Sequence, residues 1–464
     1  MYSYSAYSAD LQTLLGYSGT EVNIVSSIGD LGLYVGGIPV GYFFDSFGPS
    51  LTYILASVFL FLGYVLMWTG ALQKIPSNSW AMGFYFFVVG FGSVAGYMAG
   101  LLTNAKNFAP ENRGKIVAFL VAAYGLSAAI FSQVYQNAFD HNVARFFWFS
   151  ALILGSLPVI AIFLVKSVPL VIESKTINSV PSGQSLVAHP LSPPTSKPVP
   201  ASYSPGKYGD TRGLPVLKSP DFLLLFVVVA CCTGVGLTWI NIVGSVVRSY
   251  EITAIPASGY VIGLSIANAA GRLLFGALCD LKLVSLPPVY LLMPCLAILL
   301  LSHFILIFVD NYIYLLVATL LTGISYGGSF AVMPVIINSY FGDKNYGANL
   351  GLLILSVALG SMTMSSVSGV IYDIIARSQQ TIPPSILHQA VGLLEFGRRL
   401  TAGGGSSLVC YGLECFRWTY VMTAAVSALG LLVNILLLRR EVKFDALLKR
   451  SQDFEVHSGS NLET

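Results

Sequence analysis

Apolar stretches, each about as long as a membrane is thick, recur along most of this chain. A hydrocarbon core about 30 Å thick takes roughly 20 helical residues. On that basis we predict eleven membrane-spanning helices, at residues 22–44, 51–73, 80–104, 115–138, 146–167, 222–247, 258–279, 286–309, 312–338, 346–371 and 416–439. The first ten residues are too few to span. We interpret them as the outer end of a first helix, and we expect about 12–20 further apolar residues before Met1.

Composition supports the same class of protein. Hydrophobic residues make up 55% of the 464 residues and charged residues only 10%, whereas soluble domains carry about 25% charged residues. The net charge of +3 is too small to suggest nucleic acid as a partner, and six scattered cysteines do not make a disulfide framework. The sequence therefore predicts an all-α, multi-pass protein of the lipid bilayer. It does not distinguish the plasma membrane from a vacuolar or other endomembrane.

Loop charges predict the orientation. With the 106–115 loop placed in the cytosol, about two thirds of the 24 Lys and Arg residues fall on the cytosolic side, as the positive-inside rule requires. Segment 168–220 is rich in proline and serine, a composition that favours disorder. We predict an N-terminal transmembrane half at 1–167 (a helix 1 fragment and helices 2–6), a disordered cytosolic linker at 168–220, a C-terminal half at 221–440 (helices 7–12), and a cytosolic tail at 441–464.

Two short motifs occur once in each half. A glycine four residues before an aspartate ends a predicted span at Gly41 and Asp45, and again at Gly276 and Asp280, 235 residues later. Glu111-Asn-Arg-Gly114 and the segment from Asp343 to Gly347 each stand just before a span. Their order around the linker indicates a duplicated six-helix unit. Transporters with parallel halves bind their substrate between the halves, near the bilayer midplane.

The motif from Gly41 to Gly48 resembles the loop between helices two and three of major facilitator superfamily transporters. The family form usually adds basic residues, but Ser46 and Ser50 stand there in this chain. Other stretches are similar to the nodulin-like branch, which is related to monocarboxylate-transporter-like proteins: YSYSAYS (2–8), NFAPENRG (107–114), GLSAAIFSQ (125–133), GLTWIN (236–241), NAAGR (268–272), SYG (325–327) and CYGLECF (410–416). The resemblance covers nearly the whole chain. It implies a twelve-helix fold and membrane transport, with the motif residues Gly41, Asp45, Gly276 and Asp280 in gating loops.

Arg272 is an ionised residue in an apolar span, and placing it there costs about 2.5 kcal/mol or more. Such a residue usually faces a cavity or a partner. Asn268 lies four residues earlier on the same helix face. In monocarboxylate transporters, to which this helix is similar, an aspartate precedes an arginine by four residues, and that arginine is thought to engage the substrate carboxylate. A guanidinium fork suits a carboxylate. The alternative is that Arg272 bonds helix ends and holds the halves together.

Asp30 is the second charge inside a predicted span, roughly 10 Å below the outer face of a core about 30 Å thick. Partial loss of hydration favours the neutral acid, which a proton-coupling group needs. Protons are therefore the candidate coupling ion. The alternative is a structural carboxylate that bonds Ser27 or a backbone N–H.

Further polar and aromatic residues within spans are candidates for lining a substrate cavity, although each alone is more often a helix contact. They are Gln133, Asn241, Tyr326, Trp239 and Asn338. Cys410 and Cys415 lie in a long outer loop and can form a disulfide in an oxidising compartment, with free thiols as the alternative.

The sequence has no cluster with metal-ligand spacing, no phosphate-binding loop and no nucleophile elbow. We therefore expect no enzyme activity, metal or cofactor. We predict a secondary active transporter that moves a small, carboxylate-bearing solute by alternating access. The alternative is a solute sensor with a transporter fold, which measured flux would exclude.

Overall fold

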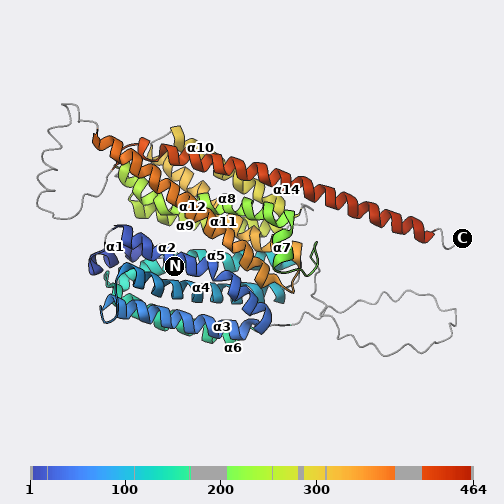
Figure 1. Ribbon diagram of the computed structural model, residues 1–464, viewed down its shortest axis with the longest axis horizontal. Helices are drawn as coiled ribbons and strands as arrows, with labels where there is room; N and C mark the ends of the chain where they lie inside the picture. The colour runs from blue at the N-terminus through green and yellow to red at the C-terminus, as the bar shows by residue number, and fades with distance from the viewer. Residues whose placement is uncertain are drawn as a thin grey trace, which may run out of the picture.

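The computed structural model describes residues 4–17, 19–108, 110–166, 168, 206–252, 254–280, 287–308, 311–381 and 410–460 (Figure 1). Regular structure in these residues is helical. The elements are α1 (Tyr4–Leu15), α2 (Gly19–Val35), α3 (Gly37–Ala71), α4 (Ser79–Asn107), α5 (Pro110–Ala138), α6 (Val143–Leu164), α7 (Leu214–Lys218), α8 (Pro220–Ser249), α9 (Ala257–Cys279), the 3-10 helix η1 (Pro288–Leu291), α10 (Leu292–Phe308), α11 (Tyr312–Phe341), α12 (Tyr346–Thr381) and α14 (Glu414–Ser460).

Within the described residues, ten helical segments are long and apolar enough to cross a membrane. They cover all eleven predicted spans and confirm the all-α polytopic fold. The difference of one arises because the spans predicted at 22–44 and 51–73 fall in one continuous helical stretch, 24–71. Gly48 interrupts that stretch with a φ of 79°, and Pro49 follows it. A glycine adopts this left-handed conformation without a Cβ clash, so the chain turns there between two spans.

Contacts along α4 show that the chain reverses direction at this turn. Gly90 of α4 packs against Gly29 and Leu33, whereas Gly92, half a turn later, packs against Leu60. The segments before and after the turn therefore lie on either side of α4 at the same level. Glycines at these contacts allow the backbones to approach closely, as is usual where helices pack within a membrane.

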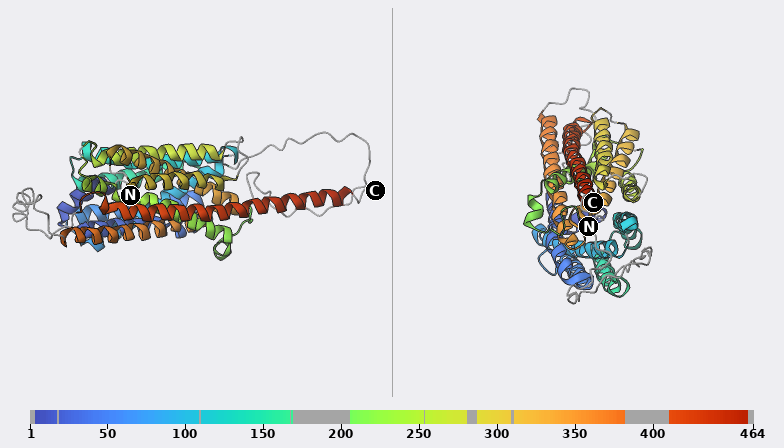
Figure 2. Two further views of the ribbon diagram at one scale, coloured as in Figure 1. Left: turned by 90° about the horizontal axis from the view of Figure 1, so that it is seen from above. Right: turned by 90° about the vertical axis from the view of Figure 1, so that its right-hand side faces the viewer.

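The spans gather in two groups that pack against each other (Figures 1 and 2). Helices α1 to α6 form one group, and α8 to α14 form the other. Across the boundary, α5 packs on α9, and α12 packs on α2 and α3. Helices α8 and α11 are buried along most of their length. The largest core cluster draws on both groups, with Val94 and Val121 from the first and Phe275, Phe330 and Leu353 from the second.

Two boundaries differ from the sequence prediction. The prediction of disorder throughout 168–220 is wrong for its last part, because residues 206–213 bond to other elements and α7 follows them. Residues 169–205 lie outside the described part of the chain. At the other end, α14 continues well past the predicted end of its span to Ser460 and extends beyond the other helices (Figure 1, red).

Candidate functional site

Two aspartates from the repeated motif bind backbone N–H groups near the start of helices in the opposite group. Asp45 accepts hydrogen bonds from the backbone N–H groups of Gly347 (3.2 Å) and Ala348 (2.7 Å), at the start of α12. In the same way, Asp280 accepts from Gly114 (2.9 Å) and Lys115 (2.7 Å), near the start of α5. Gly347 and Ala348 are the second and third residues of α12, where N–H groups have no partner within the helix and carry its positive dipole end. Gly114 and Lys115 lie in the second turn of α5, so in each case a carboxylate of one group joins a helix of the other. We call these paired contacts the latch.

The glycines of the motif allow this close approach. A Cβ on Gly41 would lie 2.1 Å from the carbonyl oxygen of Gly347, and a Cβ on Gly276 would lie 2.0 Å from the Cβ of Ala118. Both separations are well below van der Waals contact. The repeat from Gly41 to Asp45 and the repeat from Gly276 to Asp280 therefore play equivalent parts at the two contacts between the groups.

A buried ion pair adds to the latch. Arg113 Nη1 lies 2.9 Å from Asp343 Oδ1 and 2.6 Å from the side-chain oxygen of Asn338, and all three residues are buried. Arg113 comes from the first group and Asp343 from the second. We considered Asn338 a residue that could line a cavity, but the structure places it in this charged cluster instead. The two pre-span segments of the sequence repeat, which carry Arg113 and Asp343, thus contact each other directly.

Asp45 also has a cation beside it, although the loop after it lacks the basic residues of the family form. Lys106, at the end of α4, places its Nζ 3.9 Å from Asp45 Oδ1. The charge therefore comes from a different helix. The latch closes the end of the bundle that the loop charges predict to be cytosolic, and we call this end the latch end.

Arg272 lies about 12 Å from the latch, eight residues before Asp280 along α9. Its side chain is buried and bridges the groups. Nε donates to Asn268 Oδ1 (2.9 Å), one Nη donates to the carbonyl oxygen of Val121 in α5, and the guanidinium carbon lies 5.2 Å from the centre of the Phe330 ring. Nη2 is buried with no hydrogen-bond partner among the described residues.

A small cavity adjoins Arg272 at the boundary between the groups. Its volume is about 30 Å³, room for one or two water molecules. Both groups line it: Leu33, Tyr34, Val94, Tyr97 and Tyr124 come from the first, and Arg272, Phe330, Met333 and Ile354 from the second. The surroundings are largely apolar and aromatic, with one cation among them.

The other predicted site residues lie at different distances from this cavity. Asp30 is half-buried on α2, one helical turn before Tyr34, which lines the cavity. Tyr326 is fully buried and packs on Phe330, with ring centres 4.9 Å apart. Tyr326, Phe330 and the Arg272 guanidinium thus form a contiguous row.

Asn241 and Gln133 are exposed and do not line the Arg272 cavity. Asn241 donates to Ser365 of α12 (3.2 Å), and Gln133 accepts from Asn137 on its own helix (3.0 Å). A second cavity of about 360 Å³ lies within the first group, between α3, α4, α5 and α6. Tyr97 and Tyr124 line both cavities.

Sequence reasoning missed Phe330 and Tyr34. Both are ordinary aromatic residues in apolar spans, and only their position around Arg272 distinguishes them. Arg113 and Asp343 were also missed as a pair, although the repeat in which they stand was the signal that could have indicated them.

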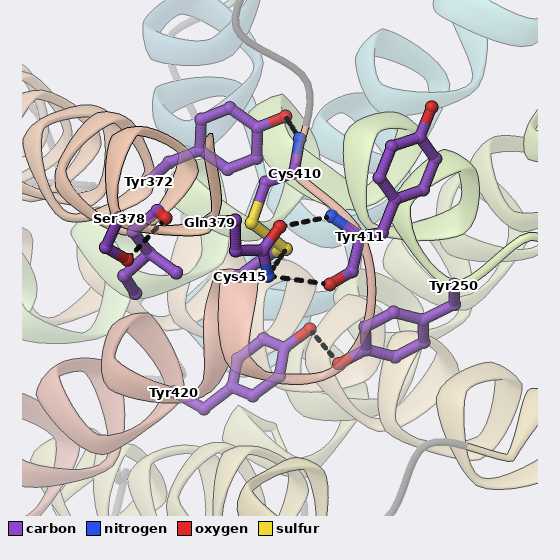
Figure 3. The surroundings of a disulfide bond; sticks show 9 residues. Tyr250, Tyr372, Ser378, Gln379, Cys410, Tyr411, Cys415 and Tyr420 are labelled. Carbon is purple, nitrogen blue, oxygen red and sulfur yellow. Dashed lines mark hydrogen bonds between the residues drawn. A yellow bond between two sulfur atoms is a disulfide. The ribbon is translucent and has the colours of Figure 1, made fainter. Parts of the chain in front are cut away.

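A disulfide joins Cys410 to Cys415 at the end of the bundle opposite the latch (Figure 3), with a Cα–Cα distance of 5.9 Å. Gln379 of α12 holds the loop between the cysteines by two hydrogen bonds to the backbone of Tyr411 (2.9 and 3.0 Å). The N–H of Gly412 donates to the carbonyl oxygen of Ser249, at the end of α8 (2.9 Å). The disulfide loop therefore connects α8, α12 and the start of α14.

Curated relatives cover most of the chain. The chain is 25% identical over 376 residues to the probable transporter MCH1 of Candida albicans, covering 79% of this chain and 80% of the relative. It is 26% identical over 392 residues to the probable transporter MCH1 of Wickerhamomyces anomalus, covering 80% and 76%. A bacterial relative, the MFS-type transporter YhjX of Escherichia coli, is 23% identical over 368 residues, covering 78% and 82%.

Solved structures share the fold at low sequence identity. The E. coli fucose:proton symporter FucP matches with a TM-score of 0.55 and 12% identity, covering 93% of this chain and 96% of FucP. A bacterial homologue of the iron transporter ferroportin, in an outward-facing state, matches with a TM-score of 0.58 and 10% identity, covering 94% and 96%. At these identities the likeness concerns the fold alone.

The family model described as Major Facilitator Superfamily matches residues 1–365, which is most of the chain. The same residues include the latch, Arg272 and the cavity beside it. Together with the relatives and the fold, this match identifies the chain as a multi-pass membrane transporter that belongs to the Major Facilitator Superfamily.

Proposed function

We propose that this chain is a secondary active transporter for a small, carboxylate-bearing solute, that Arg272 binds the carboxylate, and that Asp30 carries a coupling proton. The observation that carries the proposal is the buried Nη2 of Arg272, without a hydrogen-bond partner among the described residues, beside a cavity between the two groups. A buried donor without a partner costs about 1–3 kcal/mol, and more when it is charged. A bound carboxylate would supply that partner.

The neighbours of Arg272 favour binding of a substrate anion over a purely structural role. Nε and one Nη already have protein acceptors in Asn268 and Val121, which fix the plane of the guanidinium. Asn268 is neutral, so no internal carboxylate on this helix face neutralises the charge. Aromatic rings of Phe330 and Tyr326 continue the row. They would cover the apolar part of a small organic acid.

The position of the latch supports alternating access. In this conformation the latch end is held by Asp45, Asp280 and the Arg113–Asp343 pair. Substrate would then reach Arg272 from the opposite end, and release to the latch end would require these contacts to separate. Each contact joins one group to the other, so separation needs rotation of the groups and no unfolding within either one.

Replacing Arg272 with lysine tests the binding role. Lysine keeps the positive charge but lacks the planar fork, so we expect uptake of a labelled monocarboxylate by proteoliposomes to fall at least tenfold. The matched control is Arg248→Lys, because Arg248 is exposed at the far end of α8. Both variants should reach the membrane in normal amounts. Uptake by Arg272→Lys equal to that of the parent protein would refute the binding role. If the parent protein transports none of a broad panel of solutes, the alternative of a solute sensor with a transporter fold is favoured.

A further inference from the structure

A short part of the linker lies folded against the latch end. We call residues 206–213 the arm. The N–H groups of Lys207 and Tyr208 donate to the carbonyl oxygens of Ser339 (2.9 Å) and Tyr340 (2.8 Å), at the end of α11. At the start of α12, the side chains of Asn345 and Asn349 donate to the carbonyl oxygens of Asp210 (3.0 Å) and Thr211 (2.9 Å). The arm is thus bonded to the second group on both sides of the 342–345 turn.

Lys207 anchors the arm in the second group. Its side chain is only 7% exposed, and its Nζ lies 2.7 Å from Glu441 Oε2 and 3.3 Å from Asp221 Oδ2. It also lies 4.3 Å from the centre of the Phe444 ring. The two carboxylates are 7% and 2% exposed, and buried charges are strongly destabilising when a partner is removed. Lys207 therefore joins the arm to both α8 and α14.

Tyr208 adds a neutral contact to the same anchor. Its hydroxyl donates to Asp221, and burial together with that carboxylate raises the pKa of Tyr208 well above its ordinary value. The hydroxyl consequently stays protonated and remains a donor at any physiological pH.

The other end of the arm reaches the first group beside the latch. The chain has no Lys or Arg before Lys74, so the cations around Asp45 must come from other elements. Lys106 is one, and Arg212 of the arm is the second cation whose charge acts on Asp45. Next to it, a Cβ on Gly213 would lie 3.2 Å from the hydroxyl oxygen of Tyr42. The arm therefore touches the first group three residues from Asp45.

We propose that the arm is a strap that holds the latch closed. Lys207 fixes it to the second group, while Gly213 lies against Tyr42 of the first group and the charge of Arg212 attracts Asp45 at longer range. Opening of the latch end moves Asp45 away from Gly347 and Ala348, and in the same step it separates Asp45 from Arg212. The strap thus sets the balance between closed and open states. It rests on the proposed alternating access, but its test needs no substrate.

The first experiment removes the charge at the tip of the arm. Spin labels are attached at Phe47→Cys and Lys344→Cys, two exposed positions on opposite groups at the latch end. Pulsed electron spin resonance then measures the distance between the two labels. All proteins also carry Cys279→Ser, because Cys279 is a free and partly exposed cysteine. Arg212→Gln should raise the population with the long distance about two- to fivefold, as loss of a weak attraction by an exposed charge would. Lys218→Gln, an exposed cation in α7, is the matched control and should leave the distances unchanged.

The second experiment releases the anchor. Lys207→Gln should speed hydrogen exchange of the Lys207 and Tyr208 amides at least tenfold, and it should raise the long-distance population as Arg212→Gln does. In Arg212→Gln the same amides should keep their protection, because the anchor is intact.

The proposal is overturned if Arg212→Gln leaves the distances unchanged or if Lys218→Gln widens them equally. It is also overturned if the arm amides exchange equally fast in the parent and in Lys207→Gln. Loss of flux without a change in distance would count against a conformational role for the arm and leave the transport proposal standing.

Discussion

Two ionisable residues in the spans, Arg272 and Asp30, carry the proposed chemistry. Arg272 is buried at the boundary, whereas Asp30 is half-buried one helical turn from the cavity residue Tyr34. A proton-coupling group must exchange protons with water and also sense the substrate. A half-buried carboxylate one helical turn from the cavity meets both conditions better than one sealed inside it.

Replacing Asp30 with asparagine should remove proton-driven accumulation of substrate and leave substrate exchange across the membrane intact. The amide imitates the protonated carboxyl group in shape and charge, so the substrate site can still form and reorient. We expect Asp30→Asn to abolish accumulation driven by an imposed pH gradient and to spare counterflow exchange, which needs no net proton movement. Labelled substrate in vesicles measures both. Glu251→Gln, at the end of α8, is the control for loss of an acidic group, and unchanged accumulation by Asp30→Asn would assign Asp30 to structure.

At the scale of elements, pairs of helices meet through backbone contacts that only glycine permits. Gly276 of α9 faces Ala118 of α5, and Gly41 faces Gly347 at the start of α12. Each contact brings backbone N–H groups near the start of a helix within reach of an aspartate four residues further along. The spacing of the repeat therefore has a mechanical reason. Glycine sets the approach of the helices, and aspartate binds the N–H groups one turn later.

Substitution of Gly276 by alanine should destabilise the closed latch. The new methyl carbon would lie 2.0 Å from Ala118 Cβ, and overpacking of this kind costs about 1–3 kcal/mol. We expect a lower melting temperature in detergent. The double variant Gly276→Ala with Ala118→Gly moves the methyl group to the facing helix and should restore most of the loss. Gly369→Ala, where the added Cβ meets open space, should be nearly neutral. A double variant no more stable than Gly276→Ala would contradict this account of the contact.

At the scale of the whole molecule, the two groups contact each other at one end through two equivalent aspartates. The loop charges predict that this end faces the cytosol. The disulfide loop lies at the opposite end, where it connects α8, α12 and α14. A disulfide persists in an oxidising compartment, which agrees with that orientation.

The orientation can be tested with exposed lysines at the two ends. Lys344 lies at the latch end, and Lys74 lies in the loop between α3 and α4 at the other end. An amine reagent that does not cross membranes should modify Lys74 but not Lys344 in sealed vesicles of cellular orientation. Inverted vesicles should give the opposite result. Peptide mass spectrometry measures both sites, and modification of Lys344 alone in the first preparation would reverse the assigned topology.

The sequence by itself determined the fold class and nearly all of the spans, because burial in lipid requires long apolar stretches whatever their partners are. It also indicated Arg272, since an ionised residue in such a stretch is costly wherever the helix lies. Only the tertiary structure decided which side chains surround Arg272. Phe330 and Tyr34 look like any other aromatic residues until two distant helices bring them together. The same holds for Lys207: its linker has the composition of a disordered segment, and only the carboxylates of α8 and α14 make part of it fold. The order of apolar and polar residues is a local property of the sequence. Contacts between side chains that lie hundreds of residues apart depend instead on how the helices pack.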